Sequence, residues 1–262
     1  MSHILSPSQI QEVLGRHRLW METEGKEGER ANLSGANLNR AELQQAVLKG
    51  VDLREAVLSG AQLQGADLSG ANLQRTRLLQ ANLSGANLEG ADLRGAFLQH
   101  AILSRAHLKN AQVAPADLEG ADLRGAILDG ANFEGANLQG GNLRGAKCRN
   151  TSFYQANLRE AILVQVDFER ALLRTVDMRG SDLTDASLNG ANLQNAKMQD
   201  TDLVKVDLRG ANLQRANLQK ADLYKAQFEG ADVRGADLRD AVGFTQKHLD
   251  LVTWDKKTKL RD

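Results

Sequence analysis

Apolar residues recur at every fifth position of the chain, from Leu33 to Leu238. All 42 of these central positions are apolar, and 33 of them are leucine. An alanine stands two residues before most of them, and no residue is inserted or lost between Ala31 and Asp240. One backbone geometry must therefore repeat without interruption over residues 31–240.

A period of five excludes the two simplest regular structures. An α-helix turns ~100° per residue, so every fifth residue would move ~140° around the axis and the leucines would form no common face. A flat strand alternates sides with each residue, so successive leucines would face opposite ways. Within one repeat, however, alanine and leucine share a side, and a bend after each leucine returns the next pair to one interior. The chain is predicted to turn every five residues.

If each bend is a right angle, four repeats close a square coil. The 42 repeats then give 10.5 coils, which stack into a rod of roughly 50 Å at the ~4.8 Å strand spacing. Of the 24 glycines, 19 occupy the second residue after the central one, where a type II turn requires a positive φ. One column predicts type II turns at Gly50, Gly70, Gly90, Gly130, Gly190, Gly210 and Gly230. Corners of other columns are expected to use another turn where they carry Arg40, Gln80, Pro115, Gln165 or Lys205.

The repeated phrases resemble those of a known family. ANLSGANL at 31–38, ADLSGANL at 66–73 and ANLEGADLRGAFL at 86–98 are similar to the A(D/N)Lxx repeats of the pentapeptide repeat family. The resemblance covers residues 31–240 and implies an all-β solenoid, a right-handed quadrilateral β-helix, whose handedness the spacing alone does not fix. Because one fold hosts many functions, the resemblance says little about activity.

The first thirty residues break the repeat and predict a capping helix. Ser6 is the expected N-cap, with Pro7 at the first helical position and Gln9 completing a capping box. The helix is expected to end near Glu22 to Gly25. An apolar stripe at helical spacing should cover the first coil, because an open β-helix end exposes leucines and unpaired backbone groups. The stripe consists of Ile10, Val13, Leu14, His17 and Trp20 or Met21. The phrase from His17 to Trp20, with Gly25 and Gly28, resembles the family's lead-in segment.

Residues 241–262 are expected to form a short helical cap and a tail. Thr245 is a plausible N-cap for a helix that runs through Leu249 to Val252. Trp254 and Leu260 are expected to pack on the last coil. A small basic tail, expected to be solvated, contains Lys256, Lys257, Lys259 and Arg261. The chain is thus divided into residues 1–30, 31–240 and 241–262, as one elongated domain with capped ends.

Charge and composition narrow the setting. Lysine plus arginine equals aspartate plus glutamate at 33 each, and no segment carries the strong charge of a phosphate binder. Cys148 is the single cysteine, so an internal disulfide is excluded. The chain opens with no basic region followed by an apolar one, and no apolar run is long enough to span a membrane. We therefore expect a cytoplasmic setting with neither a membrane nor a direct nucleic-acid partner.

No constellation of catalytic or metal-binding residues stands out. His100 and His107 point from different faces, so they cannot share a metal ion. Cys148 occupies a central position, where it behaves as a small apolar side chain. A rod with a filled interior also lacks the concave pocket that enzymes use. We expect no catalytic residue, no metal and no cofactor, and infer that the protein is not an enzyme.

The positions that flank each central residue should face water, and most are polar. The apolar exceptions include Val47, Val57, Leu79, Phe97, Ile102, Ile127, Tyr154, Ile162, Val164, Leu172, Val204 and Tyr224. On one face, Val164, Thr184, Val204 and Tyr224 line up beside Ile162, Asp182, Asp202 and Asp222 on successive coils. This apolar row beside an acidic row is the predicted partner face. The alternative is that the β-branched residues add sheet propensity while Lys205 and Lys225 offset the carboxylates.

Three classes of function remain. The leading hypothesis is a non-catalytic interaction module, a rigid rod that presents flat faces to an unidentified protein partner. The second is a DNA mimic that protects gyrase, as in some family members, but a near-neutral repeat region disfavours it. Arginines that oppose a phosphate-like field are Arg54, Arg94, Arg124, Arg144, Arg159, Arg179, Arg209, Arg234 and Arg239. An enzyme is the third. Both a monomer and a cap-mediated homodimer are compatible with the sequence.

Overall fold

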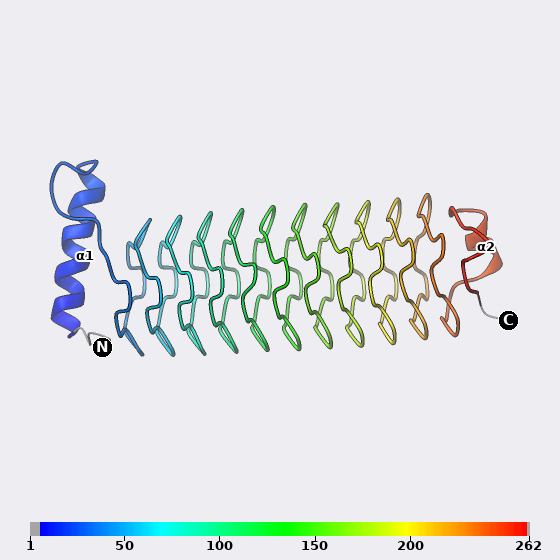
Figure 1. The fold of residues 1–262 in the computed structure, drawn as a ribbon, viewed down its shortest axis with the longest axis horizontal. Helices are drawn as coiled ribbons and strands as arrows, with labels where there is room; N and C mark the ends of the chain where they lie inside the picture. The colour runs from blue at the N-terminus through cyan, green and yellow to red at the C-terminus, as the bar shows by residue number, and fades with distance from the viewer. Residues whose placement is uncertain (1–5, 261–262) are drawn as a thin grey trace.

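The computed structural model describes residues 6–260 and shows a rod of stacked coils with a helix at each end (Figure 1). From Asn32 to Asp222, every parallel bridge in this part of the chain joins a residue to the one 20 positions later. A coil therefore contains four repeats and four walls. We number the walls by their first central residues, Leu33, Leu38, Leu43 and Leu48, and each wall continues at intervals of 20 residues.

Each coil pairs with its neighbours through one set of backbone hydrogen bonds per repeat. The Leu83 N–H donates to the Ile102 carbonyl at 2.7 Å, and the Asn82 N–H donates to the Ala61 carbonyl at 2.9 Å. The Ala86 N–H closes the corner by donating to the Leu83 carbonyl at 3.0 Å. Backbone polar groups are thus satisfied between coils, which allows an entirely apolar interior.

The interior is filled by the central residues and the alanines that precede them. Nearly all are fully buried, and Phe133, Phe153 and Phe168 are among the largest buried side chains. The rings of Phe133 and Phe153 stack at 5.2 Å, while Phe168 meets Phe153 edge-on at 5.6 Å. Buried hydroxyls at the alanine position are also satisfied: those of Thr76 and Thr151 each donate to a carbonyl of the preceding coil at 2.8 Å.

The corners share one geometry regardless of residue type. The second residue after the central one has a positive φ at 41 of the 42 corners, including 22 without glycine. The expectation of another turn at Arg40, Gln80, Gln165 and Lys205 is therefore wrong: their φ values are 55–58°. Bonds between coils fix the corner backbone, so each non-glycine residue accepts the cost of a left-handed conformation. At the remaining corner, the Ala114–Pro115 peptide bond is cis.

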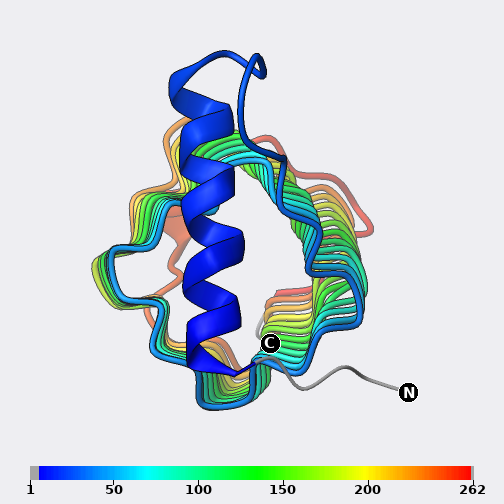
Figure 2. The same ribbon diagram turned by 90° about the vertical axis from the view of Figure 1, so that its left-hand side faces the viewer.

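Helix α1 (Pro7–Glu22) crosses the open end of the first coil (Figure 2). Ser6 is its N-cap and forms a capping box with Gln9, as the sequence predicts. Ile10 and Leu14 on its inner side are buried within the core cluster of the coils. An amphipathic helix thus covers the apolar end of the stack.

His17 is fully buried where α1 meets the first coil. Its Nδ1 accepts the Ala31 N–H at 3.3 Å, so the neutral ring carries its hydrogen on Nε2, which donates to the Lys49 carbonyl at 3.1 Å. One coil later, the equivalent Ser69 carbonyl accepts the Gly50 N–H at 2.8 Å. The imidazole therefore replaces the N–H of a missing coil. Burial lowers the pKa of His17, which favours this neutral form.

The C-terminal segment adds a partial coil. Helix α2 (Gln246–Leu249) has Thr245 as its N-cap, as predicted, and is followed by two backbone segments that pair with the last complete coil. These pairs are Asp232 with Thr253 and Asp237 with Lys259. Trp254 was expected to pack on the last coil, but its side chain lies outside this pairing and is 47% exposed.

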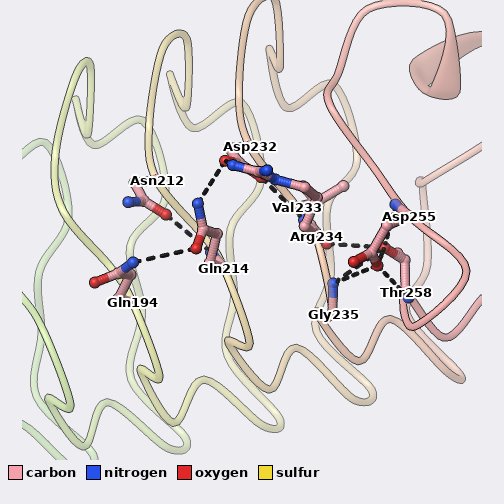
Figure 3. A network of polar contacts seen from close by, with 9 residues as sticks. All are labelled: Gln194, Asn212, Gln214, Asp232, Val233, Arg234, Gly235, Asp255 and Thr258. Carbon is pink, nitrogen blue, oxygen red and sulfur yellow. Dashed lines mark hydrogen bonds and ion pairs between the residues drawn. The ribbon is translucent and has the colours of Figure 1, made fainter.

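Polar side chains of the first wall hold this segment in place (Figure 3). The Gly235 N–H donates to Asp255 at 3.0 Å, and the Thr258 hydroxyl donates to the Val233 carbonyl at 3.1 Å. Lys259, assigned to a solvated tail, instead donates to Asp237 at 3.3 Å. Arg261, the last member of that tail, lies outside the described residues.

Candidate interaction surface

Most exposed charge on the walls is neutralised within single repeats. In the phrase Asp-Leu-Arg or its variants, the arginine guanidinium binds the carboxylate two residues before it at 2.5–2.8 Å. The backbone N–H of the same arginine donates to that carboxylate. These seven pairs are Asp52–Arg54, Asp92–Arg94, Asp122–Arg124, Asp177–Arg179, Asp207–Arg209, Asp232–Arg234 and Asp237–Arg239. Groups outside such pairs therefore dominate the field of each wall.

The pairs predict a loss of stability in acid. Hydrogen bonds from Arg234 and Arg239 lower the pKa values of Asp232 and Asp237 to about 2, below the usual 3.8, and the other five carboxyls shift in the same direction. A carboxyl with a lowered folded-state pKa stabilises the fold above its unfolded pKa and ceases to do so as pH falls through the folded value. The melting temperature should therefore fall between pH 4 and about pH 2.

Circular dichroism melts at a series of pH values measure this effect. Replacing Arg234 by glutamine removes one pair, so the variant should lose less stability than the wild type over that interval. Equal slopes for the two proteins would show that the pairs do not couple folding to protonation.

The structure assembles the acidic row of the predicted face. Ile162, Asp182, Asp202 and Asp222 occupy successive coils on the third wall and are joined by parallel bridges. Each carboxylate accepts the N–H of the residue two positions later, at 2.9–3.1 Å. Among residues 6–260, no cation lies within ion-pair distance of these three carboxylates. They are therefore unlike the paired aspartates of the other repeats.

The apolar row is assembled only in part. Val164 is 7% exposed and cannot serve as a contact residue, which corrects its assignment. It is a small side chain in a column between Arg144 and Thr184, whereas Tyr224, nearer the end of the rod, is 54% exposed. Val204 is half-buried and Ile162 is 38% exposed.

The two nearby lysines do not offset the acidic row. Lys205 lies 3.9 Å from Asp185, and the Lys225 ammonium lies 5.1 Å from the centre of the Tyr224 ring. The face therefore combines three unpaired carboxylates with an exposed aromatic residue at the C-terminal half of the third wall.

The described residues offer no catalytic arrangement. Burial, with the charges of Asp129 and Asp167, raises the pKa of the Cys148 thiol, so it is not a nucleophile at neutral pH. Within 6–260, no three potential ligands are grouped to hold a metal ion. No helix in this range is both long and apolar enough to cross a membrane. His107 belongs to the fourth wall, and His100 lies at the corner after the second wall.

One concave surface was not recognised from the sequence. A shallow groove of ≈ 300 Å³ runs along a corner of the first four coils, between Arg40 and His100, with Gly60 and Leu79 in its lining. Leu79 had been noted only as one exposed apolar residue among many. Sorting the corner residues by column would have revealed the glycine between two long side chains.

The comparisons agree with the repeat pattern. The family model described as pentapeptide repeats matches in eight copies that together span residues 31–240. No curated protein matches the chain. HetL from the cyanobacterium Nostoc, described as a pentapeptide repeat protein involved in heterocyst differentiation regulation, is 31% identical and the match covers 92% of this chain and 94% of HetL, with a TM-score of 0.36.

Two other solved structures are more distant. QnrB1, a plasmid-mediated fluoroquinolone resistance protein, is 18% identical in one of its crystal forms, with 86% of this chain and 90% of QnrB1 covered and a TM-score of 0.34. AT2G44920, a pentapeptide repeat protein from the thylakoid lumen of Arabidopsis thaliana, is 29% identical, with coverage of 40% and 72% and a TM-score of 0.28.

Proposed function

The chain belongs to the pentapeptide repeat family, whose model matches residues 31–240 without a gap, and from this premise we propose that it is a non-catalytic module that binds a protein partner through its flat walls. The observation that carries the proposal is the third wall at its C-terminal half. There, Asp182, Asp202 and Asp222 stand unpaired beside exposed Tyr224. The partner would supply cationic groups together with an apolar contact.

A regulatory role fits this module. HetL, which is similar over most of its length, is described as involved in the regulation of differentiation. A rigid rod whose interior is filled acts on other proteins through its outer surface alone. Regulation by occupying a partner's surface requires no chemistry from the rod itself.

The ends of the rod are part of the same proposal. Helix α1 buries Ile10 and Leu14 on the first coil, and the segment after α2 pairs with the last coil. We propose that both serve as caps, which keep the strand edges from pairing with other chains.

A charge reversal on the third wall tests the proposed face. Asp202→Lys should abolish capture of the partners that the wild type retains from an extract of the native host, because it places a cation where the partner's cation would bind. Asp67→Lys is the matched control, since Asp67 holds the same place in its repeat on the fourth wall and has an equivalent turn hydrogen bond. The readout is quantitative mass spectrometry of the captured proteins.

The control should retain the partners, and both variants should melt within a few degrees of the wild type. Retention of every wild-type partner by Asp202→Lys would reject the third wall as the binding face.

The DNA-mimic alternative receives less support from these charges. A mimic of the phosphate backbone needs a continuous negative field, whereas seven of the aspartates are neutralised by arginines two residues later. A gyrase supercoiling assay with a quinolone separates the two functions, because protection at a stoichiometric concentration would favour the mimic.

A further inference from the structure

The corner groove of the first four coils results from a missing side chain. The corner column contains Arg40, Gly60, Gln80 and His100, one residue per coil. Gly60 leaves a gap between the longer side chains before and after it, and Ser59 adds only a small side chain beside it. At ~4.8 Å per coil, the column spans ~14 Å, the length of four or five extended residues.

Large apolar side chains flank this gap on the second wall. Leu79 lines the groove and is 39% exposed. Phe97 lies one coil further on and is 42% exposed. Two large exposed apolar residues on adjacent coils are unusual in this rod, where most wall positions are polar. They offer a contact for an apolar side chain of a ligand.

The same region carries unpaired positive charge. Arg77 forms a bridge with Phe97 on the second wall, and Arg40 lies at the end of the groove. Within residues 6–260, neither guanidinium has a carboxylate at ion-pair distance, unlike the seven arginines that bind an aspartate two residues before them. Arginine presents a planar fork of donors that matches a carboxylate.

An unsatisfied acceptor completes the set. The Gln99 amide nitrogen donates to Asp117 at 2.5 Å, while its Oε1, which is shielded from solvent, has no hydrogen-bond partner. Gln99 is one of the residues that line the groove. A ligand that donates an N–H would satisfy this oxygen.

We propose that this groove binds an extended acidic peptide segment that carries an apolar side chain. Its carboxylates pair with Arg40 and Arg77, its apolar side chain rests on Leu79 and Phe97, and one of its N–H groups donates to Gln99 Oε1. A simple anion would use the arginines alone, and a nucleic acid would make no use of the apolar pair with its phosphates. The site lies on another wall from the proposed partner face, so each can fail without the other.

The test uses the full chain and a fluorescein-labelled synthetic peptide, Glu-Glu-Leu-Glu-Glu-Phe-Glu with an amidated end, followed by fluorescence anisotropy. Two further peptides replace all glutamates by lysine or both apolar residues by glycine. The original peptide should bind more tightly than either. Arg40→Gln and Leu79→Gln should each weaken its binding about tenfold, equivalent to ~1.4 kcal/mol.

Filling the gap provides the sharpest variant. Gly60→Asn keeps a residue that tolerates the left-handed conformation, φ 67°, and places its side chain in the groove. Gly140→Asn makes the same change in the same corner column at φ 64°, with nothing within 4 Å of the added Cβ and outside the groove. Gly60→Asn should weaken binding about tenfold, whereas Gly140→Asn should leave it unchanged.

Three outcomes would overturn the proposal. The first is equal binding by wild type and Gly60→Asn, with Gly140→Asn confirming that the fold tolerates the change. The second is equal binding of the glycine-substituted peptide, which would indicate an anion site. The third is equal or tighter binding of the lysine peptide.

Discussion

Replacing Leu173 by alanine is expected to destabilise the rod by about 3 kcal/mol, through lost burial and the cavity that remains. Leu173 is a fully buried central residue of the first wall. The interior cannot collapse to fill the space, because the backbone bonds of the coils on both sides hold the walls apart. Chemical denaturation followed by circular dichroism measures the change in the free energy of unfolding.

The preceding residue supplies a matched control. Leu172 undergoes the same chemical change in Leu172→Ala, but its side chain is 49% exposed on the outer surface. Its loss should alter the free energy of unfolding by no more than about 0.5 kcal/mol. Similar losses for the two variants would contradict the assignment of alternate sides to adjacent residues, and with it the interior described above.

Alternation within a fixed period is also what made the fold predictable. The sequence places an apolar residue at each fifth position, and only a bend after each one brings them to a common interior. The bridges at a separation of 20 residues confirm that four such bends return the chain to the same wall. Local periodicity was sufficient here because each coil contacts only its neighbours.

The corner conformation was predicted only where glycine announced it. Arg40 and Lys205 have the same positive φ as the glycines, because the bonds that their backbone N–H groups donate to the next coil fix their position. Intrinsic preference for φ is worth about 1–2 kcal/mol per residue, less than the bonds and burial gained by keeping the register. A reading of single residues cannot anticipate that balance.

The candidate face shows the same limit at its side chains. The column register correctly placed Asp182, Asp202 and Asp222 on successive coils. It could not show that Val164 would be covered while Tyr224 stays exposed, because coverage depends on the rotamers of neighbours rather than on register. The function of His17 was missed for a related reason: it replaces a backbone donor that no sequence pattern announces.

The second large effect is expected at the N-terminal end, where Gly28→Ala should destabilise the docking of α1 by about 3 kcal/mol or more, the sum of a left-handed alanine and a steric clash. A Cβ at Gly28 would lie 2.2 Å from the Arg16 carbonyl oxygen and 2.6 Å from the Trp20 nitrogen, and both are backbone atoms of α1. The helix must therefore move away, which breaks the contacts of His17 with Ala31 and Lys49.

Hydrogen exchange locates this effect, since the amides of α1 and of the first coil should lose protection while those of the central coils keep it. Gly35→Ala is the matched control: its φ of 67° imposes the same conformational cost, but nothing lies within 4 Å of the added Cβ. If α1 seals the rod as proposed, Gly28→Ala should also aggregate through the uncovered coil, while Gly35→Ala stays dispersed. Unchanged protection of α1 in Gly28→Ala would show that the helix is not held by this close approach.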